Sequence, residues 1–163
     1  MSHHVEPDPI ERVDDALAAL RAAGITAHAW AYLAAEAVRG LNHATLTPGA
    51  YPYPGDVYTV IGELVALLQR LPQALHQTGG ALEAMDHAGH VVDTAHPGEP
   101  AITSMTVIAV AEDLAETALH VQAATRTLTV AHAPAGRLAH TSSRTTNATN
   151  GADGTDGDGA GER

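Results

Sequence analysis

An unbroken heptad pattern of apolar residues constrains the fold of this chain more than any other feature of its sequence. Between residues 57 and 85, apolar residues and one threonine follow one another at alternating spacings of four and three residues. They are Val57, Ile61, Leu64, Leu68, Leu71, Leu75, Thr78, Leu82 and Met85. This spacing puts these side chains on one face of an α-helix, as in a coiled coil. The pattern therefore predicts a long amphipathic helix.

The same segment contains residues that weaken helices, Pro72 and the pair Gly79-Gly80. A proline inside a helix removes one backbone hydrogen bond, and each glycine costs about 1 kcal/mol relative to alanine. The heptad spacing nevertheless keeps one phase on both sides of Pro72. We therefore predict a single helix over about residues 56–87, bent at that proline. A break into two helices at the glycine pair is the main alternative.

Three further segments have the periodicity of amphipathic helices. We predict these helices over about residues 9–23, 27–43 and 103–131. Asp8 and Thr26 stand where they can accept hydrogen bonds from the first free backbone N–H groups of the first two helices. The last helix carries apolar residues every seven positions, at Val107, Leu114, Val121 and Leu128. No segment alternates as a strand does.

These segments predict an all-α protein, an antiparallel bundle of about four helices over residues 1–132 in which the two short helices cover the two long ones. From residue 133 onward Thr, Ser, Asn, Gly and Asp dominate the sequence. Such a composition cannot bury enough apolar surface to offset the entropy of the chain, so we expect residues 133–163 to form a disordered tail.

Composition excludes several classes of function. The formal net charge of −11 repels nucleic-acid backbones, so we expect no direct binding to nucleic acid. The absence of cysteine excludes disulfides and thiolate chemistry. No segment offers the roughly 18 uncharged apolar residues that a membrane-spanning helix needs, and the first residues are polar and acidic. We therefore expect a cytoplasmic protein without membrane association.

Potential metal ligands crowd in one place, between residues 83 and 96. The candidates are Glu83, His87, His90 and His96. If the long helix continued to His90, the first three would share one face, as metal ligands on helices do. The chain has 11 histidines, however, so local pairs also arise by chance, and solvated histidines in a loop are the favoured interpretation.

No catalytic motif is present, and we expect no cofactor. The last helix carries Glu112, Glu116 and His120 at helical spacing, which makes them the candidates if the chain is a helical enzyme. A polar outer face explains the same residues more simply.

The segment DVYTVIGELVALLQRLPQALHQTGGAL, residues 56–82, carries a resemblance to a known group of proteins. Its Asp-Val-Tyr opening, its Leu-Pro-Gln-Ala-Leu centre and the following glutamine resemble segments of small, largely uncharacterised helical proteins of actinobacteria. The resemblance implies a helical module of bacterial cytoplasmic type and no particular activity.

The long apolar stripe favours a non-enzymatic interaction module that self-associates, as in a homodimer, or docks a helical partner. The residues expected to form this interaction stripe are Val57, Ile61, Leu64, Leu68, Leu71, Leu75 and Leu82. An internally satisfied monomer is the competing interpretation. A metal-binding module built on the cluster at 83–96 is the alternative function.

Overall fold

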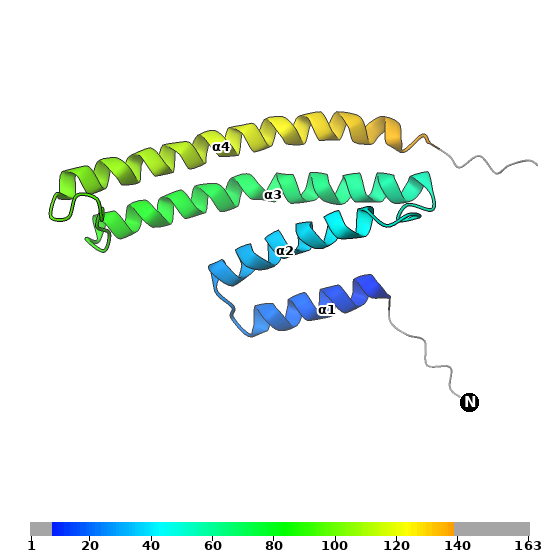
Figure 1. Cartoon of the computed structure of the whole chain (residues 1–163), viewed down its shortest axis with the longest axis horizontal. Coiled ribbons are helices and arrows are strands. Elements are labelled where there is room, and N and C mark those ends of the chain that lie inside the picture. The colour runs from blue at the N-terminus through cyan, green and yellow to red at the C-terminus, as the bar shows by residue number, and fades with distance from the viewer. Residues whose placement is uncertain (1–7, 139–163) are drawn as a thin grey trace, which may run out of the picture. The chain divides into compact units, whose positions relative to one another are not determined.

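The computed structural model describes residues 8–138, and this part of the chain folds into four α-helices without a strand. The helices are α1 (Pro9–Ala22), α2 (Ala27–Thr45), α3 (Pro54–His87) and α4 (Pro100–Ala135) (Figure 1). The chain divides into two compact units, one with α1 and α2 and the other with α3 and α4. The predicted all-α class with four helices is confirmed. No described helix is long and apolar enough to cross a membrane.

The two short helices begin where the sequence places their caps. Asp8 Oδ1 accepts a hydrogen bond from the backbone N–H of Ile10 at 2.8 Å, and Thr26 Oγ1 accepts one from Ala29 at 3.3 Å. Between the two helices Gly24 adopts a φ of +64°, which only glycine reaches without strain. Neither helix contains a buried residue.

The long third helix continues through both of its weak points. α3 runs without interruption past Pro72 and past Gly79-Gly80, so the prediction of one helix is confirmed and the break at the glycine pair is wrong (Figure 1). Its 34 residues correspond to a length of about 51 Å. Pro72 cannot donate to the Leu68 carbonyl, and the ribbon of α3 is gently bowed.

Most differences from the predicted helix bounds arise where proline begins or extends a helix, although α1 also ends one residue earlier and α2 two residues later than predicted. Pro54 and Pro100 occupy first-turn positions, so α3 and α4 begin two and three residues earlier than predicted. Helix α4 also continues through Pro134 to Ala135, so residues 133–135 are helical and the predicted start of the tail is too early. The rest of the expected tail, from residue 139 onward, lies outside the described residues.

Helices α3 and α4 pack side by side as an antiparallel hairpin joined by the loop of residues 88–99 (Figure 1). Near the loop, Ser104 donates a hydrogen bond to Asp86 at 2.7 Å. At the opposite end, which we call the open end, the Tyr58 and His132 rings stack with centroids 4.1 Å apart. Residues early in α4 therefore contact residues late in α3, and residues late in α4 contact residues early in α3, as an antiparallel register requires.

The seam between the two long helices is built from small side chains. On α3 the buried residues are Val65, Pro72 and Gly79, seven positions apart. On α4 they are Thr103, Val107 and Ala118. A Cβ added to Gly79 would lie 3.6 Å from the Cα and Cβ atoms of Ala111, so the missing side chain lets the backbones approach closely. Within the described residues no large side chain is fully buried.

Small residues also shape the open end of the hairpin. A Cβ added to Gly62 would lie 3.3 Å from His132 Nε2, and one added to Gly136 would lie 3.0 Å from the Tyr58 ring. Both glycines thus leave room for the stacked rings. His132 Nε2 is buried and makes no hydrogen bond to the described part of the chain. The sequence pattern gives no sign of this internal histidine, since its eleven histidines are scattered.

Candidate interaction surface

The predicted interaction stripe of α3 lies partly beside the seam and partly on one flank of the helix. Four of its members are half-buried and stand three or four residues from the buried seam positions: Ile61, Leu68, Leu75 and Leu82. Each of the other three lies one residue before a position on the side of α3 that packs against α4. One residue corresponds to a rotation of about 100° around the helix, so these three side chains point to the flank of that side. These are Val57, Leu64 and Leu71, of which Val57 is exposed and the two leucines are half-buried.

The seam of α3 is therefore centred one position later than the leucine-rich stripe. Its centre runs through Val65, Pro72 and Gly79. The sequence pattern misses this centre because proline and glycine score as helix breakers and not as core residues. The spacing of Val65, Pro72 and Gly79 by seven residues, between the leucines, is the signal that could have identified the centre of the seam.

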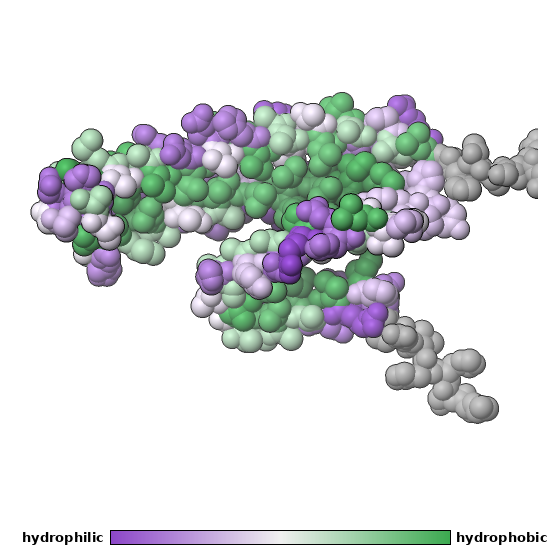
Figure 2. All heavy atoms as spheres, in the orientation of Figure 1, coloured by the Kyte–Doolittle hydropathy of each residue, from purple (hydrophilic) through white to green (hydrophobic). Residues whose placement is uncertain are grey.

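Large apolar side chains remain exposed on the outside of α4. Met105 is 70% exposed, Leu119 is 62% exposed and Val130 is 74% exposed. Leu119 follows the fully buried Ala118 by one residue, so it points about 100° away from the middle of the seam. Figure 2 shows hydrophobic residues along both long helices on the face in view.

A row of exposed residues, together with the half-buried Ala115, forms a periodic set on one side of α4, which we call the outer stripe. Its members are Met105, Ile108, Glu112, Ala115, Leu119, Ala123, Arg126 and Val130. They are spaced by three or four residues, so they share one side of the helix. Sequence reasoning missed this stripe because two charged residues interrupt it and the buried heptad of the same helix is more apolar. The repeated spacing from Met105 onward is the signal that could have found it.

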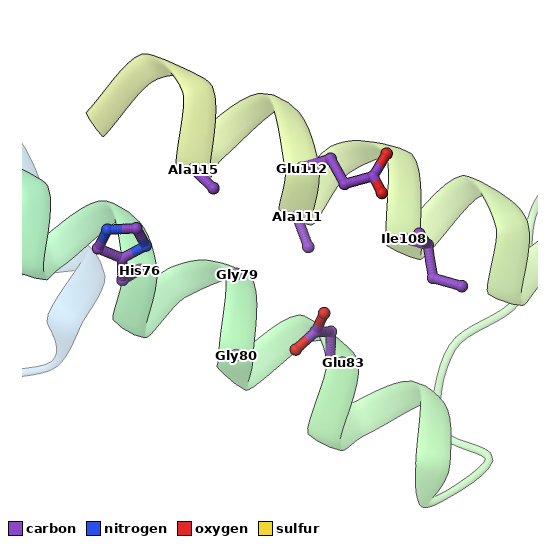
Figure 3. A pocket seen from close by; sticks show the side chains of 8 residues that line it. All are labelled: His76, Gly79, Gly80, Glu83, Ile108, Ala111, Glu112 and Ala115. Carbon is purple, nitrogen blue, oxygen red and sulfur yellow. The ribbon is translucent and has the colours of Figure 1, made fainter. Parts of the chain in front are cut away.

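A hollow of about 330 Å³ lies between the long helices next to the outer stripe (Figure 3). Gly79 and Gly80, which carry no side chains, form part of its lining. Glu83 and Glu112 line this space from opposite helices, and in Figure 3 the Glu83 side chain extends toward α4 while the Glu112 carboxylate lies beside α4. The remaining lining residues are His76, Ile108, Ala111 and Ala115. Two carboxylates beside apolar walls suit a positively charged group carried on an apolar stem.

A second hollow, of about 300 Å³, lies further along the same pair of helices. It is lined by Leu68, Gln69, Pro72, Gln122, Thr125 and Arg126. Arg126 brings a positive charge to this hollow, whereas the first hollow holds two negative charges. Leu119 lies between the two hollows along α4. The outer stripe thus has an acidic part and a basic part on either side of Leu119.

The candidate metal ligands do not share one helical face. Helix α3 ends at His87, and Gly89 then adopts a φ of +71°, so His90 leaves the helix. The condition under which Glu83, His87 and His90 would share one face, a helix that continues to His90, is therefore not met. His87 Nδ1–H donates to the Glu83 carbonyl at 2.8 Å.

The remaining candidate, His96, lies in the loop, with its Nδ1 3.7 Å from Asp93 Oδ2. Among residues 8–138 no three histidine or acidic side chains come close enough together to hold a metal ion. The metal-binding alternative stays a prediction.

The candidate catalytic residues of α4 are also spread over its surface. His120 Nε2 lies 4.0 Å from Glu116 Oε1, and both side chains are exposed. Glu112 instead lines the hollow of Figure 3. The three residues do not converge on one space.

Hydrogen bonds through Asp93 fasten the connecting loop to the start of α4. Its backbone N–H donates to Thr103 Oγ1 at 3.1 Å, and its carboxylate accepts from Thr106 Oγ1 at 2.9 Å and from the Ala95 N–H at 2.8 Å. The hydrogen bond from Ala95, followed by those from Thr106 and the charge of His96, lowers the pKa of Asp93. The ionised form of Asp93 therefore holds the loop.

The lowered pKa of Asp93 predicts an acid-sensitive contribution to stability. Because the pKa is lower in the folded than in the unfolded chain, this contribution is complete above the unfolded value of about 3.9 and is lost as the pH falls through the folded value. We expect Asp93→Asn to lose this part of the acid dependence. Thermal melting followed by circular dichroism between neutral and strongly acidic pH measures the effect.

Asp113→Asn, which removes an exposed carboxylate from α4, serves as the matched control. The melting temperature of this control should fall with acidification as steeply as that of the wild type. An Asp93→Asn variant with an unchanged acid dependence would contradict the assigned role of Asp93.

The hairpin therefore presents one coherent outer surface, on which apolar residues flank opposite charges. Comparison of the chain with protein-family models, with curated proteins and with solved structures found no match, so its function is inferred from this surface.

Proposed function

We propose that this chain is a helical protein–protein interaction module that self-associates or docks a helical partner. The observation that carries the proposal is the exposure of Met105, Leu119 and Val130 on one side of α4. Ile108, Ala115 and Ala123 lie between them on the same side of α4 and connect them into an apolar row that Glu112 and Arg126 interrupt. Apolar surfaces of this kind mark interaction sites, and covering them yields about 25 cal/mol for each Å² removed from water.

The thin seam of the hairpin supports the same proposal. The residues that α3 and α4 bury are small, and no large side chain of the described part of the chain is fully enclosed. A two-helix hairpin with such a core gains stability when a further helix covers its apolar flank. On α3, Leu64 and Leu71 remain half-buried beside the seam and extend the apolar surface.

Light scattering coupled to size-exclusion chromatography tests the self-associating form of this proposal. We expect the mass to rise above the 16.8 kDa of one chain as the protein concentration increases. For the docking form, a partner captured from the native host should bind the wild type and fail to bind Leu119→Asp. A strictly monomeric chain without any Leu119-dependent partner would overturn the proposal.

A further inference from the structure

We infer that the occupant of the outer stripe is a second copy of this chain, docked antiparallel about a twofold axis that passes beside Leu119. This inference rests on the proposed function and specifies its self-associating form. It follows from the order of residues along the outer stripe. When this order is set against the same order in the opposite direction, opposite charges face each other and residues of similar size face each other.

The charged residues of the outer stripe are placed symmetrically about Leu119. Glu112 lies seven residues before it and Arg126 seven residues after it, about 10.5 Å in each direction along the helix axis. When two copies of α4 lie antiparallel with Leu119 against Leu119, Glu112 of each copy faces Arg126 of the other. A parallel arrangement would instead set Glu112 against Glu112.

The apolar residues of the outer stripe obey the same symmetry. Ile108 and Val130 each lie eleven residues from Leu119, and both are exposed. Ala115 and Ala123 each lie four residues from Leu119. The antiparallel pair therefore matches a large apolar residue with a large one and a small residue with a small one. This matching lets the two helices approach closely near the axis and bury the large side chains further out.

The acidic hollow of Figure 3 strengthens the charge pairing. Arg126 of the second copy reaches α4 at the level of Glu112, which lines this hollow together with Glu83. A guanidinium group there meets two carboxylates beside the apolar wall of Ile108 and Ala111. The twofold axis gives the assembly two such sites, one on each copy.

Charge reversal tests the inference. In a homodimer of Glu112→Arg, two arginines face each other at both sites, and in a homodimer of Arg126→Glu, two glutamates do. We expect the dissociation constant of each single variant to rise about tenfold or more. An equimolar mixture of the two variants should form a heterodimer in which every pair is again attractive, with an affinity near that of the wild type.

Light scattering and sedimentation of each variant and of the mixture provide the measurement, with circular dichroism to confirm unchanged helicity. Asp113→Arg is the matched control, because it changes the net charge as Glu112→Arg does from a position about 100° away around the helix. We expect it to dimerise nearly as the wild type does.

Cross-linking provides a second, independent readout. The chain has no cysteine, so Leu119→Cys introduces a single thiol. Mild oxidation should convert this variant to a disulfide-linked dimer, whereas Asp113→Cys should stay largely unlinked.

The outcomes separate the inference from the proposed function. A wild type that is monomeric at every concentration overturns both the inference and the self-associating form of the function. A dimeric wild type overturns the inference alone if single reversals leave its affinity unchanged, or if mixing them restores nothing. Heterodimers between wild type and Glu112→Arg that are tighter than either homodimer would indicate the parallel arrangement instead.

Discussion

Replacing Val107 with aspartate should nearly unfold the α3–α4 hairpin. Val107 is 4% exposed and lies on the face of α4 that packs against α3. A carboxylate there would lose its hydration without gaining an opposite charge, because Asp86 and Asp93, which bond to the first turns of α4, are acidic as well. We expect the free energy of unfolding to fall by about 3–5 kcal/mol. Urea denaturation followed by circular dichroism measures it.

Val110→Asp is the matched control for this variant. It makes the same substitution in the same helix three residues later, where the side chain is 40% exposed. Because water still reaches this position, the expected loss is within about 1 kcal/mol. Equal losses for the two variants would show that Val107 does not lie at the centre of the seam.

The glycine pair of α3 yields the second large effect. Gly79 is buried against Ala111, whereas a Cβ added to Gly80 would meet no atom within 4 Å. Gly79→Leu and Gly80→Leu gain the same helix propensity, so the difference between them isolates packing. We expect Gly79→Leu to be less stable than Gly80→Leu by about 1–3 kcal/mol, because a leucine at position 79 forces the two helices apart.

Gly79→Ala provides a finer test of the same contact. The added methyl group would lie 3.6 Å from the Cα and Cβ atoms of Ala111, which is an ordinary van der Waals distance. Thermal and urea melts should therefore show that alanine at position 79 is tolerated and leucine is not. If Gly79→Leu were as stable as Gly80→Leu, the close approach of the helices at this point would be wrong.

Periodicity and capping chemistry were enough to predict the helices. The spacing of the leucines on both sides of Pro72 indicated one helix. α3 continues through this proline, whose burial in the hairpin offsets the missing hydrogen bond of that turn. Asp8 and Thr26 marked helix starts correctly because their side chains act on neighbouring backbone N–H groups. Such local interactions join residues that are close together in the sequence, so they can be predicted from it directly.

The centre of the seam and the outer stripe were harder to predict from the sequence. Gly79 is a core residue only because Ala111, 32 residues later in the chain (from 79 to 111), comes to lie against it. The outer stripe likewise becomes visible only when the buried face of α4 is known, since the remaining apolar residues can then be assigned to the outside. The geometry of His90 depended on one glycine, Gly89, whose left-handed conformation ends α3.

The antiparallel register also sets the order in which the hairpin can assemble. The hydrogen bond from Ser104 to Asp86 closes a segment of only 18 residues, whereas the approach of His132 to Gly62 closes one of 70 (from 62 to 132). Loop closure is cheaper for the shorter segment, so pairing starts near residues 88–99 and proceeds towards Tyr58. During synthesis on the ribosome, all of α3 emerges before the first residue of α4. The leucines of α3 therefore lack their partner helix until α4 has been made.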